Sequence, residues 1–245
     1  MLMLYKSITL ILFLISINCN SQEIIKTFHQ DSITNEKITD LKIKYGTNKI
    51  LLGDYENQTL IALSCFPELK DIKIKFRLKN RTTPLATRPS LFSMFRSAKN
   101  RTYIITISKQ SNAKLDTITL KNLNYNSQIG VIGHELSHVS DYGNKGFGKM
   151  WNVLAIEIFS KKKVDAFEYN TDLICINHGL GYQLLDWSTN VRENLKRVNW
   201  LGAVNLTEDE KSERYMNPTT IINIITNHPL YKENKEQSQN CQEKE

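Results

Sequence analysis

The residues with the clearest chemical potential lie in one short segment, which contains the pattern His-Glu-x-x-His as His134, Glu135 and His138. On an α-helix, side chains four residues apart leave the same face about one turn apart. Both imidazoles can therefore offer a nitrogen to one zinc ion at about 2.0–2.1 Å. Glu135 is rotated by about 100° from His134, which keeps it off the metal but near a water that the metal holds.

The neighbours of these residues favour a metal site over two ordinary helix histidines. Ile132 and Gly133 precede His134, and Val139 follows His138. An exposed helix would carry Lys or Glu at such positions, because charged side chains are mostly exposed. The absence of charge at these flanking positions therefore favours a buried metal site over two ordinary helix histidines.

A catalytic zinc site needs a third protein ligand and one open position, and the sequence offers three carboxylates. The extended pattern HExxHxxGxxH supplies its own third histidine, but its glycine and histidine positions hold Asp141 and Asn144 here. Asp141 itself lies one turn beyond His138 and could bind the metal. Asp165 and Glu168, on the helix predicted over 162–177, are the other two candidates.

Glu168 and Asp172 form the pattern Glu-x-x-x-Asp, which again places two side chains on one helix face. Apolar residues surround this face, so a carboxylate there is expected to be buried and to need a partner. Glu168 would bind the metal, while Asp172 would accept the free N–H of a ligating imidazole. Such a contact fixes the tautomer and raises the basicity of the ligand.

The segment HELSH at 134–138, followed by EYNTD at 168–172, resembles the gluzincin zinc metallopeptidases, although no individual family is assigned. The resemblance implies one zinc ion per chain with three protein ligands, namely His134, His138 and Glu168. It also implies that Glu135 is the catalytic base and that Asp172 orients a ligand. The implied fold is zincin-like, with the strand Thr102–Ser108 as the sheet edge that lines the substrate cleft.

The expected reaction follows from these residue types. Zinc lowers the pKa of a bound water toward about 7, and Glu135 would take the proton as general base and return it to the leaving amine. Enzymes of this kind usually have a further donor to the oxyanion, and the sequence leaves its identity open. The candidates are Tyr142 and His228, and also Tyr169, His178 and Tyr182.

A helix over about 127–141 must carry the motif. Asn126 or Ser127 is its expected N-cap, and Gly143 is its expected end. Its apolar stripe lies opposite the two histidines and consists of Ile129, Ile132, Leu136 and Val139. The helix is therefore expected to pack by one side and to present the metal ligands on the other.

Elsewhere the pattern predicts strands first and helices later. Alternating or β-branched residues predict strands over 41–45, 71–76 and 101–108. After about residue 125 the period is helical, and the remaining predicted helices are those over 149–160 and 162–177, a short one with a Thr207–Glu210 capping box, and one that starts at Asn217-Pro218. Strands followed by helices indicate an α+β fold, with an N-terminal twisted β-sheet region packed on a C-terminal helical region.

The two ends of the chain differ in composition from the part between them. Residues 1–21 combine Lys6, an apolar run and a small-residue site, which is the pattern of a signal peptide. Cleavage would release a secreted or periplasmic protein, and lipid attachment at Cys19 is the alternative. Residues 22–231 would form the zincin-like domain, and residues 232–245 a disordered polar tail with almost no apolar content.

Composition excludes several classes of protein. The 245 residues are 40% hydrophobic and 23% charged, with ten Gly and five Pro, which excludes collagen-like and wholly disordered chains. The formal charge of +7 is mild, and the basic residues look scattered, so nucleic acid is not an expected partner. The apolar run of the signal is too short to span a bilayer comfortably.

Together these features predict an exported zinc metallopeptidase that acts on a peptide or protein substrate. Two alternatives remain open. One is a zinc-binding surface or periplasmic protein without activity, although such a protein has no need of Glu135. The other is a zinc amidohydrolase that acts on cell-wall fragments.

Overall fold

The computed structural model describes residues 24–146, 148–150, 161–200 and 215–232. The predicted signal peptide, residues 151–160 of one predicted helix, the Thr207–Glu210 capping box and nearly all of the polar tail lie outside these ranges. Within them, no helix has both the length and the apolar character needed to cross a bilayer.

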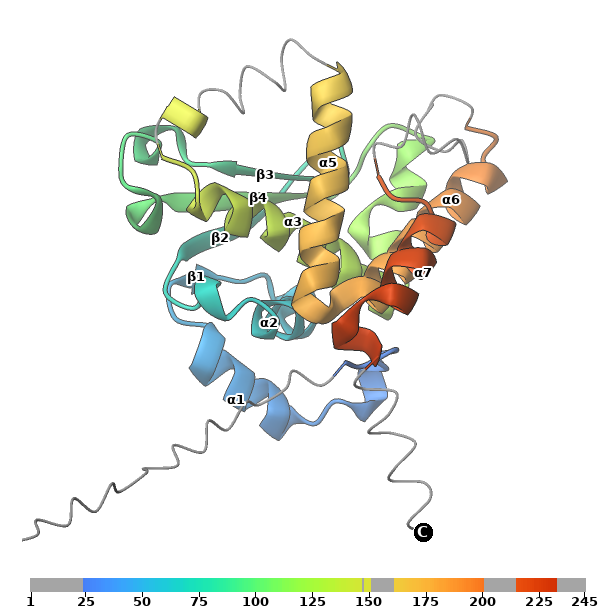
Figure 1. Ribbon diagram of the computed structural model, residues 1–245, viewed down its shortest axis with the longest axis horizontal. Helices are drawn as coiled ribbons and strands as arrows, with labels where there is room; N and C mark the ends of the chain where they lie inside the picture. Colours follow the sequence, from blue (N-terminus) through green and yellow to red (C-terminus); the bar gives the residue numbers. More distant parts are fainter. Residues whose placement is uncertain (1–23, 147, 151–160, 201–214, 233–245) are drawn as a thin grey trace, which may run out of the picture.

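The described residues form one four-stranded sheet with the order β1-β2-β4-β3 (Figure 1). Three strands run parallel: β1 (Lys49–Ile50), β2 (Lys73–Lys79) and β4 (Thr102–Ser108). The fourth, β3 (Leu85–Pro89), pairs antiparallel with β4 and forms an edge. Alternate residues of β2 and β4 bury one face of the sheet in the core: Ile74, Phe76, Tyr103, Ile105 and Ile107.

Two predicted strands are present, but one has a different place in the sheet. The strand predicted over 71–76 begins two residues later as β2, and the strand predicted over 101–108 is β4. β4 has a partner on each side, so the expectation that Thr102–Ser108 is the sheet edge is wrong. The edge on this side of the sheet is β3, whose terminal Pro89 is tolerated there because an edge strand leaves some N–H groups unpaired.

The predicted strand over 41–45 is wrong, because these residues form the second half of α1 (Asn35–Tyr45). The Thr34 side chain caps the helix by accepting a hydrogen bond from the Lys37 N–H. Leu41 and Tyr45 face the protein at helical spacing, whereas Ile43 is 73% exposed. The apolar alternation that suggested a strand therefore does not correspond to one buried face.

Mixed α+β architecture is confirmed, although helices also occur in the N-terminal half. The helix α2 (Glu56–Ser64) connects β1 to β2, which makes a β-α-β unit that the sequence did not indicate. Short 3-10 turns occur at Gln30–Ser32, Gly53–Tyr55, Pro67–Leu69, Leu91–Ser93, Ala98–Asn100, Leu115–Ile118 and Leu120–Asn122.

The helix α3 (Tyr125–Gly143) lies between the sheet and the C-terminal helices (Figure 1). It contacts α2, α5, α6 and β3, so it is buried along most of its length. It ends at Gly143 as expected, but its N-cap is Asn124, whose side chain accepts from the Ser127 N–H at 2.8 Å. The predicted cap Asn126 instead accepts a hydrogen bond from the Phe28 N–H.

Three further helices complete the described chain: α5 (Lys161–Cys175), α6 (Gly181–Arg197) and α7 (Pro218–Asn227). A π-helical turn, Ile176–Leu180, joins α5 to α6, and Gly179 has a φ of 82° there. This left-handed conformation favours glycine, and it turns the chain near the predicted end of the helix. α7 starts as expected, because the Asn217 side chain accepts from the Thr220 N–H.

Two glycines allow the close approach of α3 to its neighbours. A Cβ at Gly130 would lie 2.1 Å from the Gln183 carbonyl oxygen of α6, and one at Gly133 would lie 2.5 Å from Leu180 Cδ1. Distances this short are not tolerated in a close-packed interior. Because these two positions lack a side chain, the motif helix can approach its neighbours this closely in the core.

We predict that Gly130→Ala destabilises the protein by about 1–3 kcal/mol or more, because the new methyl group must displace the backbone of α6. Gly143→Ala, in the same helix, is the control, because a Cβ there meets no atom within 4 Å. It should leave stability unchanged or raise it by up to about 1 kcal/mol. Urea denaturation of both variants measures the difference, and equal stabilities would contradict the packing argument.

A polar network fixes α3 to the α2–β2 connection on its other side. The Glu68 carboxylate accepts from the Ser140 hydroxyl at 2.6 Å and contacts His178 Nε2 at 3.0 Å. His178 Nδ1 lies 2.8 Å from the Ile174 carbonyl oxygen, so both ring nitrogens face acceptors. Only the protonated imidazole, which carries a proton on each nitrogen, can donate to both. Burial lowers the pKa of His178, but the contact with Glu68 outweighs it and raises the pKa above 6.5.

This network predicts a pH-dependent contribution to stability. Burial acts to raise the pKa of Glu68, but its contacts with His178 and Ser140 hold it below 4.5. The stabilisation by Glu68 is lost as the pH falls through that lowered pKa, and that by His178 is lost as the pH rises above 6.5 through its raised pKa. The cost of His178→Gln should therefore be larger at pH 6 than at pH 9.

Urea denaturation of chelator-treated protein at the two pH values measures this cost. The control is His29→Gln, which removes an exposed imidazole. A cost of His178→Gln that is the same at both pH values would show that the imidazole acts only through its stacking on Phe66 at 4.2 Å.

Candidate metal centre

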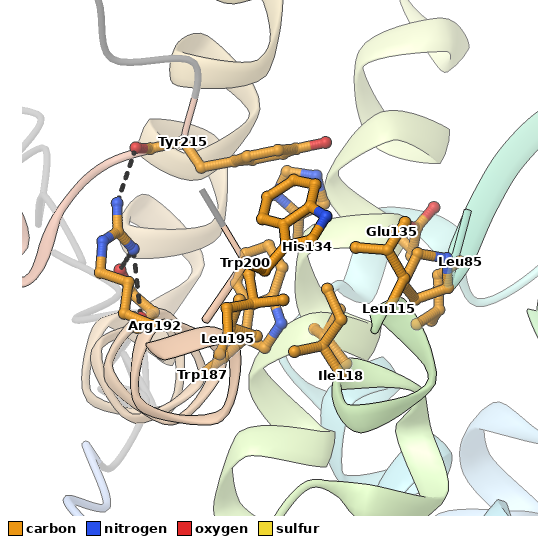
Figure 2. Close-up of a pocket in the computed structure, with 14 residues that line it drawn as sticks. Leu85, Leu115, Ile118, His134, Glu135, Trp187, Arg192, Leu195, Trp200 and Tyr215 are labelled. Carbon is orange, nitrogen blue, oxygen red and sulfur yellow. Dashed lines mark hydrogen bonds between the residues drawn. The ribbon is translucent and has the colours of Figure 1, made fainter. Parts of the chain in front are cut away.

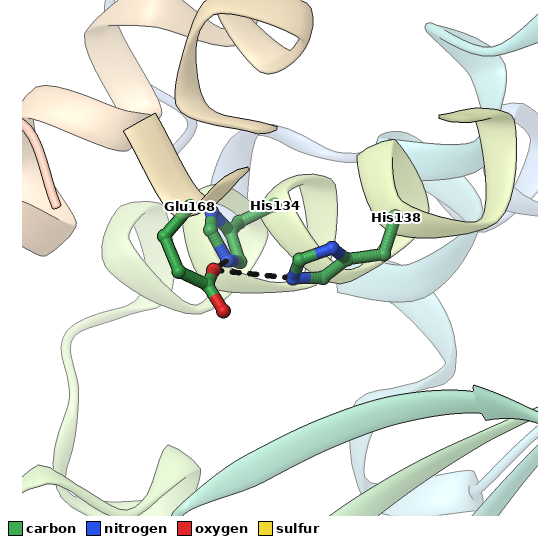
Figure 3. A group of neighbouring side chains, drawn as sticks. All are labelled: His134, His138 and Glu168. Carbon is green, nitrogen blue, oxygen red and sulfur yellow. Dashed lines mark ion pairs between the residues drawn. The ribbon is translucent and has the colours of Figure 1, made fainter. Parts of the chain in front are cut away.

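His134, His138 and Glu168 form a cluster whose candidate ligand atoms all lie within 4.8 Å of one another. The two histidines come from α3 and the carboxylate from α5, and the side chains turn toward a common point (Figure 3). Glu168 Oε2 lies 3.2 Å from His134 Nε2 and 3.3 Å from His138 Nε2. The structure thus brings together three of the predicted metal-binding residues, from two helices.

Each histidine is held through its other ring nitrogen. His134 Nδ1 lies 2.8 Å from Asp172 Oδ1, so an N–H there donates to the carboxylate. His138 Nδ1 lies 3.3 Å from the Thr171 hydroxyl, which donates its own proton to the Phe167 carbonyl oxygen and can accept one from the ring. With Nδ1 protonated in both rings, both Nε2 atoms present lone pairs to the cluster.

The cluster fits a metal cation, because it otherwise places acceptors against one another. Glu168 Oε2 is buried and has no hydrogen-bond donor among the described residues. Two imidazole lone pairs and a buried carboxylate require a positive charge between them, and a metal ion supplies it without a change of tautomer. The group could therefore bind a metal ion.

Without a metal, protons must take this role, and the pKa values show it. Burial acts to raise the pKa of Glu168, but the neighbouring His138 and His134 outweigh it and hold the pKa far below its usual range. Burial acts to lower the pKa of His134, but its contacts with Asp172 and Glu168 outweigh it and raise the pKa well above 6.5. Metal binding at this site is therefore expected to release protons.

Asp172 connects the cluster to a third part of the chain. Its Oδ1 contacts His134, and its Oδ2 accepts from the Met216 N–H at 2.8 Å. The side chain is only 1% exposed. The carboxylate thus spans α3, α5 and the segment before α7, and both of its oxygens are satisfied, which allows it to be buried.

The other two carboxylates considered as ligands do not belong to the cluster. Asp141 forms an ion pair with Lys145 one turn further along the chain. Asp165 lies on α5 but is not among the residues whose ligand atoms converge.

Glu135 lies beside the cluster without being part of it. Its side chain is buried, and its Oε2 accepts a hydrogen bond from the Thr87 hydroxyl at 2.6 Å. Thr87 belongs to the edge strand β3, so the sheet positions a carboxylate that α3 carries. No sequence pattern indicated this role for Thr87, because the role depends on which strand lies at the edge beside α3.

A pocket of about 170 Å³ opens beside Glu135 and His134 (Figure 2). Its walls are mostly apolar and are formed by Pro84, Leu85, Leu115, Ile118, Val131, Trp187, Val191, Leu195 and Trp200. The pocket thus offers an apolar space that ends at the candidate base and at one candidate ligand. Such a combination is typical of small-molecule or side-chain binding sites.

Tyr215, which lies outside the sequence motifs, also lines this pocket. Its ring centroid lies 5.6 Å from that of His134, and its carbonyl oxygen accepts from Arg192 (Figure 2). The hydrogen bond from the Met216 N–H to Asp172 fixes the adjacent backbone. No sequence signal could have identified Tyr215, because it lies far from the motifs and approaches them only through this contact.

None of the predicted oxyanion donors lines this pocket. Tyr142 is buried one turn beyond His138, with its ring stacked on that imidazole at 5.9 Å. His228 follows α7, and its Nε2 contacts the Asn177 side chain at 3.0 Å. Neither residue lines the pocket beside Glu135, whereas Tyr215 does.

Comparisons with protein-family models, with curated proteins and with solved structures found no match. The resemblance to gluzincins therefore rests on the motif residues and on the cluster that they form.

We predict that the chain from Gln22 onward, purified without chelator or metal-affinity tag, holds about one metal ion per molecule. Loss of a residue that only orients a metal ligand usually weakens metal binding by about 10–100-fold. Glu168→Ala should weaken it by more than this, because the substitution removes a ligand itself. Elemental analysis and competition with a chromogenic chelator measure this effect.

Asp165→Ala is the matched control, because it removes a carboxylate from the same helix outside the cluster. It should leave metal binding unchanged. Metal loss in Asp165→Ala but not in Glu168→Ala would show that Asp165, and not Glu168, is the third ligand. Retention of the metal in both variants would contradict the assignment of Glu168 and leave Asp141 as the remaining candidate.

Proposed function

We propose that this protein is an exported zinc-dependent metallopeptidase of the gluzincin type, with a zincin-like arrangement of sheet and active-site helix. The observation that carries the proposal is the combination of a two-histidine, one-carboxylate cluster with an adjacent carboxylate, Glu135, that faces a pocket. Catalytic zinc sites characteristically have three protein ligands and leave one position open. When bound, zinc supplies a Lewis acid that lowers the pKa of water and polarises a carbonyl group.

The surroundings of Glu135 support its role as general base. Thr87 binds one of its carboxylate oxygens, which leaves the other for proton transfer. Glu135 takes a proton from the attacking water and delivers it to the leaving amine. The buried position of the side chain strengthens both transfers, because electrostatic interactions are stronger where water is excluded.

The apolar pocket supports a peptide as the substrate. A space of about 170 Å³ with aliphatic and indole walls can hold one large apolar side chain next to the scissile bond. Tyr215, which lines the pocket beside His134, would donate a hydrogen bond to the developing oxyanion. Both features favour an enzyme over a zinc-binding protein without activity, which would use neither.

We predict that Glu135→Gln retains the metal but lowers hydrolysis by about 10²–10⁴-fold, the usual contribution of a general base. Fluorogenic casein and a mixed peptide library are suitable substrates, and metal content is measured on the same sample. Thr87→Val is a companion variant, which should retain the metal and lose less activity, because it affects only the orientation of Glu135.

Hydrolysis of peptides at the wild-type rate by Glu135→Gln would overturn the assignment of the base. A wild-type protein that holds its metal but releases products only from peptidoglycan fragments would favour the amidohydrolase alternative. A metal-loaded protein that hydrolyses neither substrate would favour a binding protein.

A further inference from the structure

The positive charge of the chain is concentrated in one segment and is not scattered. Residues 72–115 contain eleven Lys and Arg residues and no Asp or Glu. The rest of the chain has 21 basic and 25 acidic residues, so the whole basic excess comes from this segment. It forms β2, β3, β4 and the connections between them, which places the charge on the sheet side of the molecule.

The strand registers gather this charge on one face of the sheet. Alternation along β2 puts four basic residues opposite its buried side chains: Lys73, Lys75, Arg77 and Lys79. Ile104 of β4 pairs with Lys75 on one side and with Arg88 of β3 on the other, so Arg88 belongs to the same face. In the described part of the chain these five residues, here named the basic face, form no ion pair.

An apolar tip adjoins the basic face where β3 leads into β4. Leu91 is 63% exposed, Phe92 91% and Phe95 72%. These are three of the six large apolar side chains that are exposed in the described residues, and they lie within five positions. Arg96 and Lys99 follow immediately and are exposed as well. Clustering of this kind marks an interaction site, whereas single exposed apolar residues do not.

The loop that carries this tip is well anchored. Between the exposed residues, Ser93 and Met94 point inward and are buried. The Ser90 N–H donates to the Thr102 carbonyl oxygen at 2.7 Å, which closes the base of the loop. Arg101 is fully buried and donates to the Lys145 carbonyl oxygen at 2.7 Å, which ties the loop to the segment after α3. The exposed side chains are therefore presented outward by an ordered scaffold.

We propose that the apolar tip, Leu91 to Phe95, and the basic face together form a docking surface for an anionic lipid bilayer. Apolar side chains can enter the boundary between headgroups and acyl chains, and neighbouring Lys and Arg side chains are attracted to anionic headgroups. A soluble polyanion such as nucleic acid would satisfy the charges but leave Leu91 and Phe92 without an apolar environment. The surface contains no residue of the metal centre, so the proposal does not depend on the proposed enzymatic function.

Sedimentation with vesicles tests the proposal on the chain from Gln22 onward, which lacks the apolar leader but contains every residue that the structure describes. Vesicles of phosphatidylcholine with 30% phosphatidylglycerol should bind the protein, and pure phosphatidylcholine should bind it at least tenfold more weakly. Phe92→Ser combined with Phe95→Ser should weaken binding to the anionic vesicles at least tenfold. Lys73→Gln combined with Lys75→Gln, which removes two exposed charges of the basic face, should weaken it by about fivefold for each charge removed.

Matched controls remove similar groups elsewhere. Ile43→Ser removes an apolar side chain that is 73% exposed on α1, and Lys37→Gln with Lys70→Gln removes two exposed charges. Both should bind like wild type. Circular dichroism confirms that every variant is folded, and cleavage of a soluble peptide, where present, should be unchanged in the tip variants.

Absence of binding to anionic vesicles would overturn the proposal, as would equal binding to both vesicle types or equal binding of the tip variant and wild type. Duplex DNA serves as the second probe. If wild type and the tip variant both bind DNA tightly and neither binds vesicles, the basic face is a binding site for a soluble polyanion. That result would also overturn the proposal.

Discussion

The structure depends on one electrostatic requirement, the neutralisation of a buried carboxylate between two imidazoles. Glu168 approaches His134 and His138 so closely that a cation or shared protons must lie among them. Every group around the cluster is consistent with this requirement. Asp172 and Thr171 engage the far nitrogens of the rings, which directs the near nitrogens toward Glu168. The site is thereby organised before any metal binds, which favours affinity.

Close packing of the motif helix makes this organisation possible. α3 is surrounded by α2, α5, α6 and the edge strand β3, so its two candidate ligands are buried and cannot turn toward solvent. Gly130 and Gly133 permit the approach on the α6 side. On the opposite side, Ser140 and the Glu68–His178 pair fix the helix by polar contacts that are mutually satisfied. Rigid elements hold a site more accurately than loops do, because packing restricts their side chains.

The motif side chains of α3 point toward two different neighbours. Its histidines face α5, whereas Glu135, one position further along, faces β3 and the apolar pocket. The pocket wall also includes Tyr215, whose neighbour Met216 is bonded to Asp172. A change at Asp172 would therefore affect both His134, a candidate metal ligand, and the wall of the pocket. The sheet contributes on its inner face to the site and on its outer face presents the basic surface.

The sequence alone determined the motif helix, the shared face of His134 and His138 and the mixed α+β class, because helical spacing is local and puts residues four apart on one face. The approach of Glu168 to the two histidines was decided by the packing of α5 against α3. It could not distinguish strand from helix at Leu41–Tyr45, where short apolar alternation satisfies both patterns. It could not identify Thr87 or Tyr215 either, since their contacts join residues distant in the chain. Which strand forms the edge, and which face collects the basic residues, was decided by strand order and register. These depend on how the elements pack together, and no single segment encodes them.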